Sequence, residues 1–554
     1  MHRLAEDSSK PHLSPPGATA RALQRPPGTV LEALPVVQSF QMIFGSPWPP
    51  LQHASASVGD VVLGAARLFG DKPAFIEGET GRTLTYHQLI HGAERVAAGL
   101  ARAGLQPGQS LALALPNSID FALAFFGAMR AGAWVVPINP IYTPSEMEHQ
   151  IHDSGARFLV TVPERVADLA SLVDAVFEIG GRWNELLECG GRPPEVHSSP
   201  DGLAMLPYSS GTTGKPKGVM LTHANVLANV HQLITAMGRT QQDVLVNVFP
   251  LYHAAGLCIL NSHLTVGATV VLMKRFDLEG WLALIDRYRG TYVLIPPPVV
   301  LAIAKSPSWD RFRLDSLQSA FCGAAPLGAD LQKAFEDRTG LVLRQIWGMT
   351  EATALLSIDM NDRTARKLGS CGYLVPSLEV RIVDVATLQE LGPQETGELW
   401  VRGPNIMQGY WKQPAATTDT LVSDGWMRTG DIGYLDSDGC IYLVDRLKEL
   451  IKYNAQQVAP AELEDIIQSH PAVLDAAVIG APDEAAGEIP MAFVVRKDGA
   501  YLDAAELMSF VAARVAPHKK VRAVEFIDTI PKSPTGKILR RLLKERVRTR
   551  HAAG

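Results

Sequence analysis

Short apolar runs alternate with longer amphipathic segments from residue 84 onward. The runs predict strands over 111–115, 133–138, 244–249, 269–273, 292–295, 319–321 and 343–346. Between two of these runs, Ser118 precedes the segment 119–131, and its hydroxyl suits the N-cap of a helix. Short apolar strands that alternate with helices indicate βαβ units, so this part of the chain is expected to build parallel α/β sheets.

The pattern changes beyond residue 370, where predicted helices become rare. Short strands separated by tight turns are expected over 378–383, 397–402, 433–435 and 441–444, as in a small barrel or an antiparallel sheet. After residue 445 follow helices 460–469 and 504–514 and strands 476–479 and 492–496. These form a unit large enough for an independent α+β domain.

Length and the first fifty residues complete this outline. A chain of 554 residues is too long for one core. Paired prolines at 15–16, 26–27 and 49–50 break any helix, so residues 1–45 are expected to form a disordered extension. The fold class is therefore α/β: a large N-terminal domain of parallel α/β sheets plus a small β-barrel over 46–445, and a small α+β C-terminal domain.

Composition excludes several kinds of protein. Apolar residues make up 47% and charged residues 19%, which is ordinary for a globular chain. The net charge of −6 argues against binding to nucleic acid. The sequence shows no secretion signal and no run of eighteen apolar residues, and the most apolar stretch, 121–137, resembles a buried helix leading into a strand. The five cysteines are scattered and lack zinc spacing, which favours reduced thiols in a cytoplasmic protein.

Residues 208–218 form the most informative stretch, a loop rich in glycine, hydroxyl groups and lysine. Its candidate ligands are Ser209, Ser210, Gly211, Thr212, Thr213, Gly214, Lys215 and Lys217. Bare N–H groups in such a loop favour anions. Pro216 stands where a Walker A loop has Ser or Thr, so this is not that motif. A flexible linker is the alternative, but it does not explain the two lysines or the apolar residues that follow.

The loop resembles the phosphate-binding motif of the adenylate-forming superfamily, which includes acyl-CoA synthetases, luciferases and the adenylation domains of peptide synthetases. Further motifs of that superfamily follow in the expected order at 347–351, 428–431, 445–449 and 531–537. The resemblance covers residues 55 to 547. Segments 296–307 and 323–328 are most similar to the coumarate–CoA ligase branch.

This resemblance implies a reaction in two halves. A carboxylic acid and ATP, with Mg²⁺, give acyl-AMP and pyrophosphate, and coenzyme A then displaces AMP. Positioning and charge stabilisation dominate such chemistry, so no side-chain nucleophile is required. The alternatives are loading of a carrier-protein thiol, a luciferase-like oxygenase and a nucleotide-binding scaffold without catalysis. The composition, rich in Arg and Ala, suggests a bacterial enzyme of secondary metabolism, expected as a monomer or homodimer.

Lys537 is the expected main catalytic residue. It lies in a Pro/Gly turn that presents one lysine at a fixed point, and the resemblance implies that it is the adenylation lysine. Residues 446–448 correspond to the hinge, with Lys448 as its key residue, and residues 449–554 to a mobile lid. Without the resemblance, Lys537 would be interpreted as a solvated surface lysine.

Glu351 is the expected magnesium ligand, because Mg²⁺ prefers oxygen ligands, and Thr350 is expected to bind a phosphate oxygen. The alternative places Thr350 at a helix N-cap with Glu351 in the first turn, and both can hold together.

Other residues are expected to contact ATP. Trp347 stacks on adenine or borders the acyl tunnel, unless it is a core residue. Asp431, in a loop before a strand, suits ribose hydroxyls, and the alternative is a turn aspartate. Arg446 suits ribose or phosphate, and the alternative is an ion pair with Asp445 or Glu449. The resemblance adds Gly323, Ala324, Ala325, Gly348, Met349 and Gln457.

The acyl pocket is expected around His253, which gates it in relatives but is otherwise a structural histidine. Small residues widen an apolar pocket, and Thr353 narrows another wall. The pocket residues are His253, Ala254, Ala255, Gly256, Ala324, Gly348 and Thr353. We expect a hydrophobic acid bulkier than a cinnamate.

One loop departs from the family pattern. Lys452, Ala455 and Gln456 correspond to the path of coenzyme A, and Ala455 replaces a glycine. Its methyl group resists a positive φ, which bears on thiol transfer and leaves adenylation unaffected.

Overall fold

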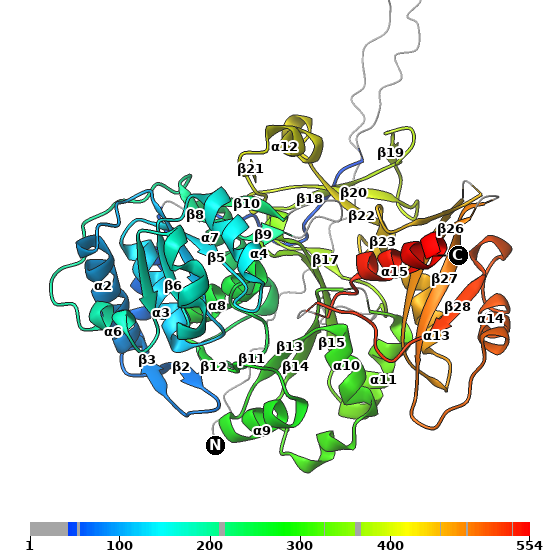
Figure 1. Ribbon diagram of the computed structural model, residues 1–554, viewed down its shortest axis with the longest axis horizontal. Coiled ribbons are helices and arrows are strands. Elements are labelled where there is room, and N and C mark those ends of the chain that lie inside the picture. Colours follow the sequence, from blue (N-terminus) through cyan, green and yellow to red (C-terminus); the bar gives the residue numbers. More distant parts are fainter. Residues whose placement is uncertain are drawn as a thin grey trace, which may run out of the picture. The chain divides into compact units, whose positions relative to one another are not determined.

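The computed structural model describes residues 42–52, 56–209, 216–325, 327–359, 367–454, 456–483, 486–533 and 536–553. Most of the predicted extension 1–45 lies outside these residues. So do Ser210, Gly211, Thr212, Thr213, Gly214, Lys215 and Ala455. Figure 1 shows the arrangement of the elements.

The first sheet is parallel in its centre. Its order is β21 (Gly409–Tyr410), β10 (Lys217–Thr222), β8 (Leu203–Met205), β5 (Trp134–Pro137), β4 (Ser110–Ala114), β6 (Phe158–Thr161) and β7 (Ala175–Glu178), with β9 (Tyr208–Ser209) beside β10. Helix α4 (Pro144–Ser154) contributes Met147 and Ile151 to the core on one face.

The second sheet has nine strands. Its order is β17 (Tyr373–Leu374), β16 (Leu355–Ile358), β15 (Leu343–Gly348), β14 (Ser319–Cys322), β13 (Tyr292–Ile295), β11 (Val244–Asn247), β12 (Thr269–Leu272), β2 (Pro73–Glu77) and β3 (Thr83–Thr85). The pairings from β2 to β15 are parallel.

Two cores cover the faces of this second sheet. Along β13, Tyr292 and Leu294 enter one core while Val293 and Ile295 enter the other, because successive strand residues face opposite sides. The first core includes α1 (Val58–Ala66), α2 (Tyr86–Arg102), α3 (Ile119–Arg130), α7 (His223–Met237) and α8 (Ala254–Val266). The second includes α9 (Leu278–Tyr288), α10 (Pro297–Lys305) and α11 (Ala329–Thr339), which lie beside the sheet in Figure 1. Burial on both faces explains the continuous apolar runs of these strands.

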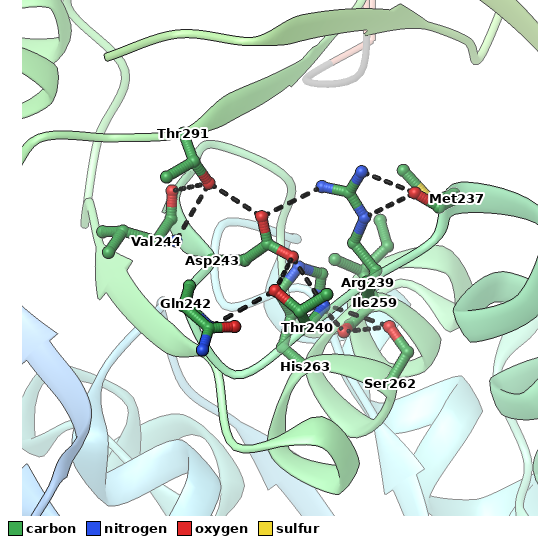
Figure 2. Close-up of polar contacts among 10 residues, drawn as sticks. All are labelled: Met237, Arg239, Thr240, Gln242, Asp243, Val244, Ile259, Ser262, His263 and Thr291. Carbon is green, nitrogen blue, oxygen red and sulfur yellow. Dashed lines mark hydrogen bonds and ion pairs between the residues drawn. The ribbon is translucent and has the colours of Figure 1, made fainter. Parts of the chain in front are cut away.

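A buried polar cluster fixes the loop that enters β11 (Figure 2). Asp243 accepts hydrogen bonds from Thr240 N at 2.7 Å and from Thr291 Oγ1 at 3.0 Å. Arg239 lies 3.6 Å from Asp243, and its guanidinium covers the ring of Tyr292 at 4.1 Å. His263 on α8 stacks on the same ring. The cluster therefore joins α8 to the amino ends of β11 and β13.

The remaining strands form two further sheets. The third is antiparallel: β1 (Phe44–Gly45), β18 (Glu379–Val383), β20 (Gly397–Arg402), β22 (Met427–Leu435) and β23 (Ile441–Arg446), with β19 (Glu390–Leu391) beside β18. The fourth contains β25 (Gln456–Val458), β24 (Ile451–Tyr453), β27 (Gly487–Arg496), β26 (Val473–Asp483) and β28 (Ala523–Phe526). It is packed with α13 (Pro460–Gln468), α14 (Ala504–Ala512) and α15 (Arg540–Ala553).

The predicted fold class is confirmed: a large N-terminal region of α/β sheets precedes a smaller α+β region. Ser118 caps α3 as predicted, accepting from Phe121 N. Of the two alternatives for residues 378–444, the antiparallel sheet is found rather than the closed barrel. The pairings among the described residues run from β1 to β23 without closing. The prediction of Asp431 in a loop is also wrong, because Asp431 lies within β22 and pairs with Arg446 of β23.

All five cysteines are buried as free thiols. Among the described residues, no helix combines the length and apolar character needed to cross a bilayer.

Candidate active site

A cavity of about 170 Å³ lies at the ends of strands β14 and β15. Its other walls are the end of β23 and the turn that carries Lys537. The carboxyl ends of neighbouring parallel strands share one edge of a sheet, which brings the residues that follow them together. Seven residues predicted from sequence line this cavity: Ala324, Ala325, Trp347, Gly348, Asp431, Arg446 and Lys537.

Lys537 is held by a tight turn. Its backbone N–H donates to Ser533 Oγ at 3.1 Å, and its carbonyl accepts from Ser533 N at 2.8 Å. Gly536 has a φ of +81°, and a Cβ there would lie 2.8 Å from Pro298 Cγ at the start of α10. The turn is therefore packed directly against the large α/β region.

Lys537 is partly buried, and its ammonium lies close to other charges. Burial lowers its pKa, Arg446 lowers it further, and Glu449 and Asp431 oppose this shift. Among the described residues, no carboxylate lies within ion-pair distance of Lys537 Nζ. The lysine is thus a cation available to an anionic ligand rather than a solvated surface residue.

Asp431 joins two other predicted residues. It stands opposite Arg446 in the pairing of β22 with β23, and Arg446 Nε lies 2.8 Å from its Oδ1. Trp347 Nε1 donates to its Oδ2 at 2.8 Å. The Asp431 carboxylate raises the pKa of Arg446. The partner of Arg446 is therefore Asp431, and the alternative pairing with Asp445 or Glu449 is wrong. Trp347 is both a core residue and part of the cavity wall.

Glu351 lies at the end of the phosphate-loop hairpin. Its Oε1 accepts hydrogen bonds from Ser209 Oγ at 2.9 Å and from Tyr410 OH at 3.0 Å. Burial, and then Glu351, raises the pKa of the Tyr410 phenol. Lys217 lies over the Tyr410 ring at 4.7 Å. Strands β9 and β10 pair antiparallel on either side of the predicted loop, so Glu351 stands beside Ser209, the last described residue of β9.

Thr350 begins a single 3₁₀ turn, Thr350–Ala352, whose N-cap position is Met349. The alternative of Thr350 as a helix N-cap is therefore wrong, because Thr350 lies inside this turn, and its binding to a phosphate oxygen stays a prediction. Gly348 permits a close backbone approach, since a Cβ there would lie 1.7 Å from Ala354 O. Ala324 has a φ of 77°, although it is not glycine. It follows Gly323, where a Cβ would meet Ile346.

Four of the predicted acyl-pocket residues lie at the start of α8: Ala254, Ala255 and Gly256 begin the helix, and His253 directly precedes it. His253 Nε2 is buried with no hydrogen-bond partner among the residues that the structure describes, and burial lowers the pKa of His253 to about 4. At Gly256 a Cβ would lie 2.1 Å from Pro250 O, so the glycine is required by backbone packing. Ala254 is buried in the main core, and Ala255 is half-buried. Thr353 donates to Asn405 O at 2.7 Å. Of the predicted acyl-pocket set, Ala324 and Gly348 line the cavity described above, whereas His253, Ala254, Ala255, Gly256 and Thr353 do not.

The altered loop forms the exposed hairpin β24–β25, in which Lys452 stands opposite Gln457 and Tyr453 opposite Gln456. Lys452 N donates to Glu488 Oε2 at 2.9 Å. The hairpin residues do not line the cavity. Lys448 lies in the turn between β23 and this hairpin.

Sequence reasoning missed Tyr410, Glu464 and Arg540. Glu464 and Arg540 line the cavity, and Tyr410 binds Glu351. Only Arg540 had a usable signal, its position three residues after Lys537, and a basic helix start is ordinarily interpreted as a solvated face.

Comparison with known proteins agrees with this geometry. Residues 64–411 match the family model described as AMP-binding enzyme, and residues 462–537 match that described as AMP-binding enzyme C-terminal domain. The chain is 40% identical to 4-coumarate–CoA ligase 3 of Oryza sativa subsp. japonica, over 86% of this chain and 90% of that protein. It is 41% identical to 4-coumarate–CoA ligase of Pinus taeda, over 86% of this chain and 93% of the relative.

Solved structures show the same fold. ATP-bound MatB from Rhodopseudomonas palustris is similar with a TM-score of 0.84 and 28% identity, covering 89% of this chain and 99% of that one. The Bacillus subtilis o-succinylbenzoate CoA synthetase in complex with the acyl-adenylate OSB-AMP has a TM-score of 0.79 and 29% identity, covering 89% and 99%. The bacterial origin expected from composition stays a prediction. With these motifs, this cavity and these relatives, the chain belongs to the AMP-binding enzyme family.

Proposed function

We propose that this protein is an AMP-forming acid–thiol ligase that activates a hydrophobic carboxylic acid with ATP and transfers the acyl group to coenzyme A. The observation that carries the proposal is the meeting of Lys537, Arg446, Asp431 and Trp347 around one cavity. Two cations on the wall of one cavity suit a ligand that brings both a carboxylate and phosphates.

In the first half-reaction an oxygen of the acid attacks the α-phosphorus of ATP. The new O–P bond forms while the bond from the α-phosphorus to the bridging oxygen breaks, and pyrophosphate leaves. Negative charge on the carboxylate and the phosphate opposes this approach, and the Lys537 ammonium stabilises both groups as they meet. Because the lysine is partly desolvated, its charge acts more strongly than it would in bulk water.

Asp431 is assigned to the ribose. One carboxylate can accept hydrogen bonds from two neighbouring hydroxyls, and its present contacts with Arg446 and Trp347 fix its orientation. Arg446 would then contact ribose or phosphate oxygens from the same side, and Trp347 would border the adenine.

Glu351 is the proposed magnesium ligand. The described residues contain no group of three or more metal-ligating side chains, which suits Mg²⁺ held by one carboxylate and substrate phosphates. Ser209 and Tyr410 bind Oε1 and orient the carboxylate. The metal would neutralise triphosphate charge, and the predicted phosphate loop, with Thr350, would bind the same group.

In the second half-reaction a thiolate attacks the acyl carbonyl, a C–S bond forms, the C–O bond to AMP breaks, and AMP leaves. Coenzyme A is the proposed acceptor, because the named relatives are CoA ligases. We assign Lys452 and Gln456 to the thiol path and Gln457 to the adenylate after movement about Lys448. A carrier-protein thiol is the second candidate, favoured by the replacement of glycine by Ala455 in the altered loop.

The test is pyrophosphate release over a panel of aromatic and aliphatic acids, with and without coenzyme A, and with the acyl-CoA product separated by chromatography. We expect a hydrophobic acid to release pyrophosphate and to yield a CoA ester. Release of pyrophosphate with no ester, together with loading of a carrier protein, would replace the CoA assignment. No release with any acid would overturn the proposed activity.

A further inference from the structure

Arg540 lies three residues after Lys537 and is surrounded by carboxylates. Its Nη1 forms an ion pair with Glu449. Its Nη2 contacts both oxygens of Glu464, at 2.7 and 2.8 Å, and its Nε donates to Val478 O at 3.2 Å. The side chains of these three charged residues are 9–12% exposed. A buried guanidinium with this many partners has one well-defined position.

Glu449 is placed where it can meet either of two cations. It follows the segment 446–448 directly, lines the cavity and acts electrostatically on Lys537. Yet no carboxylate of the described residues reaches Lys537 Nζ, whereas Arg540 holds Glu449 directly. Two cations therefore compete for one carboxylate, and in this structure the arginine binds it.

We propose that Arg540 is a positioning residue that holds Glu449 away from Lys537, so that the lysine ammonium stays unpaired and available to the substrate. The proposal rests on the proposed function, in which Lys537 stabilises the meeting of carboxylate and α-phosphate. An ammonium already paired with a buried carboxylate carries little net charge toward a second anion, and it would be drawn away from the cavity.

Glu464 fixes the arginine for this task. It lies on α13 and accepts a hydrogen bond from Val478 N at 2.7 Å. Both of its carboxylate oxygens also accept from Arg540 Nη2. With two nitrogens fixed by Glu464 and Val478 O, Nη1 can reach Glu449. A lysine at position 540 has one nitrogen and could not make all three contacts in this geometry.

The test uses Arg540→Met, Arg540→Lys, Glu449→Gln and the double variant R540M/E449Q. The matched control is Arg541→Met, since Arg541 is the neighbouring arginine, its side chain is 75% exposed, and it forms an ion pair with Glu545 on its own helix. Pyrophosphate release is measured in steady state, and ester formation from supplied acyl-AMP is measured in single turnover.

We expect R540M to lower kcat for pyrophosphate release by about 10–100-fold with KM nearly unchanged, because a group that acts in the transition state is misplaced. R540K should fall between R540M and the wild type. The double variant should regain about tenfold over R540M, since the competing carboxylate is then neutral. Thiol transfer should change far less. A double variant no better than R540M, or equal losses in both half-reactions, would overturn the proposal in favour of a merely structural role.

A second readout does not depend on turnover. The pKa of Lys537 is measured by pH-dependent acetylation of the intact protein and quantified by mass spectrometry. R540M should raise this pKa, because a neighbouring cation is lost and Glu449 is freed, while R541M should leave it unchanged and R540M/E449Q should return toward the wild type. An unchanged pKa in R540M would overturn the proposal. If the wild type releases no pyrophosphate, the ligase function fails, but this measurement still decides how Glu449 pairs.

Discussion

The partial desolvation of Lys537 strengthens its interaction with anionic substrates, and the same desolvation costs free energy when the protein folds. Desolvation lowers the pKa of Lys537, and the nearby Arg446 lowers it further. A ligand that brings negative charge into the cavity reverses both effects, so the lysine interacts most favourably when the acid and ATP are bound. At the residue scale, the proposed adenylation depends on the Lys537 ammonium having no carboxylate partner before the substrates bind.

Lys537→Ala should therefore lower acyl-AMP formation by about 10²–10³-fold, the usual cost of removing one preorganised charge-stabilising group. Thioester formation from supplied acyl-AMP should be far less affected, because that half-reaction attacks a carbonyl. Lys274→Ala, at an exposed lysine of the large region, is the control. Equal losses in the two half-reactions would remove Lys537 from its assigned role.

His263 makes a prediction about stability. Burial lowers its pKa to about 4, whereas an unfolded histidine titrates near 6.5. Between these values the unfolded state binds more protons, so stability is lost as pH falls from about 6.5 toward 4. His263→Gln should reduce the loss in free energy of unfolding between pH 7 and 5 by on the order of 1–2 kcal/mol. Denaturant unfolding at both pH values checks this.

Part of the acid sensitivity should remain in His263→Gln, because burial also lowers the pKa of His223 and of His253 to about 4. His152→Gln, at a largely exposed histidine, serves as the control. The assignment fails if the two variants lose the same stability on acidification.

At the scale of elements, the sequence predicted the buried strands best. Runs such as 292–295 and 397–402 match β13 and β20 at both ends, because their side chains are almost all buried. The hairpin β26–β27 was predicted too short, since its polar outer ends pair through backbone atoms that the apolar pattern does not report. Asp431 fell in a strand for the same reason.

Some residues of the candidate site could be predicted from the sequence and others could not. Lys537, Arg446, Asp431 and Trp347 lie in recognisable motifs and were predicted to contact ATP. Tyr410, Glu464 and Arg540 were not, because their contacts arise only when segments far apart in sequence pack together. Periodicity and motif spacing carry no information about such contacts between distant segments of one chain.

The turn before Lys537 allows an element-scale test. Gly536→Ala would place a methyl group 2.8 Å from Pro298 Cγ in a backbone with positive φ, so the turn must shift away from α10. We expect adenylation to fall by at least about tenfold, since a displacement of about 1 Å costs that much or more. Gly499→Ala is the matched control: its φ is +73°, but no atom lies within 4 Å of the added Cβ. Equal adenylation by the two variants would show that the contact with Pro298 does not position Lys537.

At the scale of the whole molecule, the cavity is lined from both sides of residues 446–448. Asp431 and Trp347 precede this segment, and Lys537 and Glu464 follow it. A hydrogen bond from Ala461 N to Asp445 Oδ2, at 2.9 Å, also crosses it. Binding of a nucleotide should therefore stabilise the large region itself and also its association with the smaller region.

Saturating ATP, at about 100 times its Kd, should add about 2.7 kcal/mol to the free energy of unfolding, visible as a raised Tm. Asp431→Ala should abolish most of this shift, because the carboxylate assigned to the ribose is lost. Lys537→Ala should retain most of it, since that residue is assigned to the transition state. A full ATP shift in Asp431→Ala would contradict the ribose assignment.

The division of the cavity also has a practical consequence. Two hydrophobic cores, formed by residues between 451 and 547, belong wholly to the smaller region, while Asp431, Arg446 and the start of α8 belong to the larger one. A gene cut within 446–448 would separate the groups assigned to nucleotide and acid from the lysine assigned to catalysis. The two fragments would then form a split reporter, in which light or colour coupled to pyrophosphate appears only when fused partners bring the halves together.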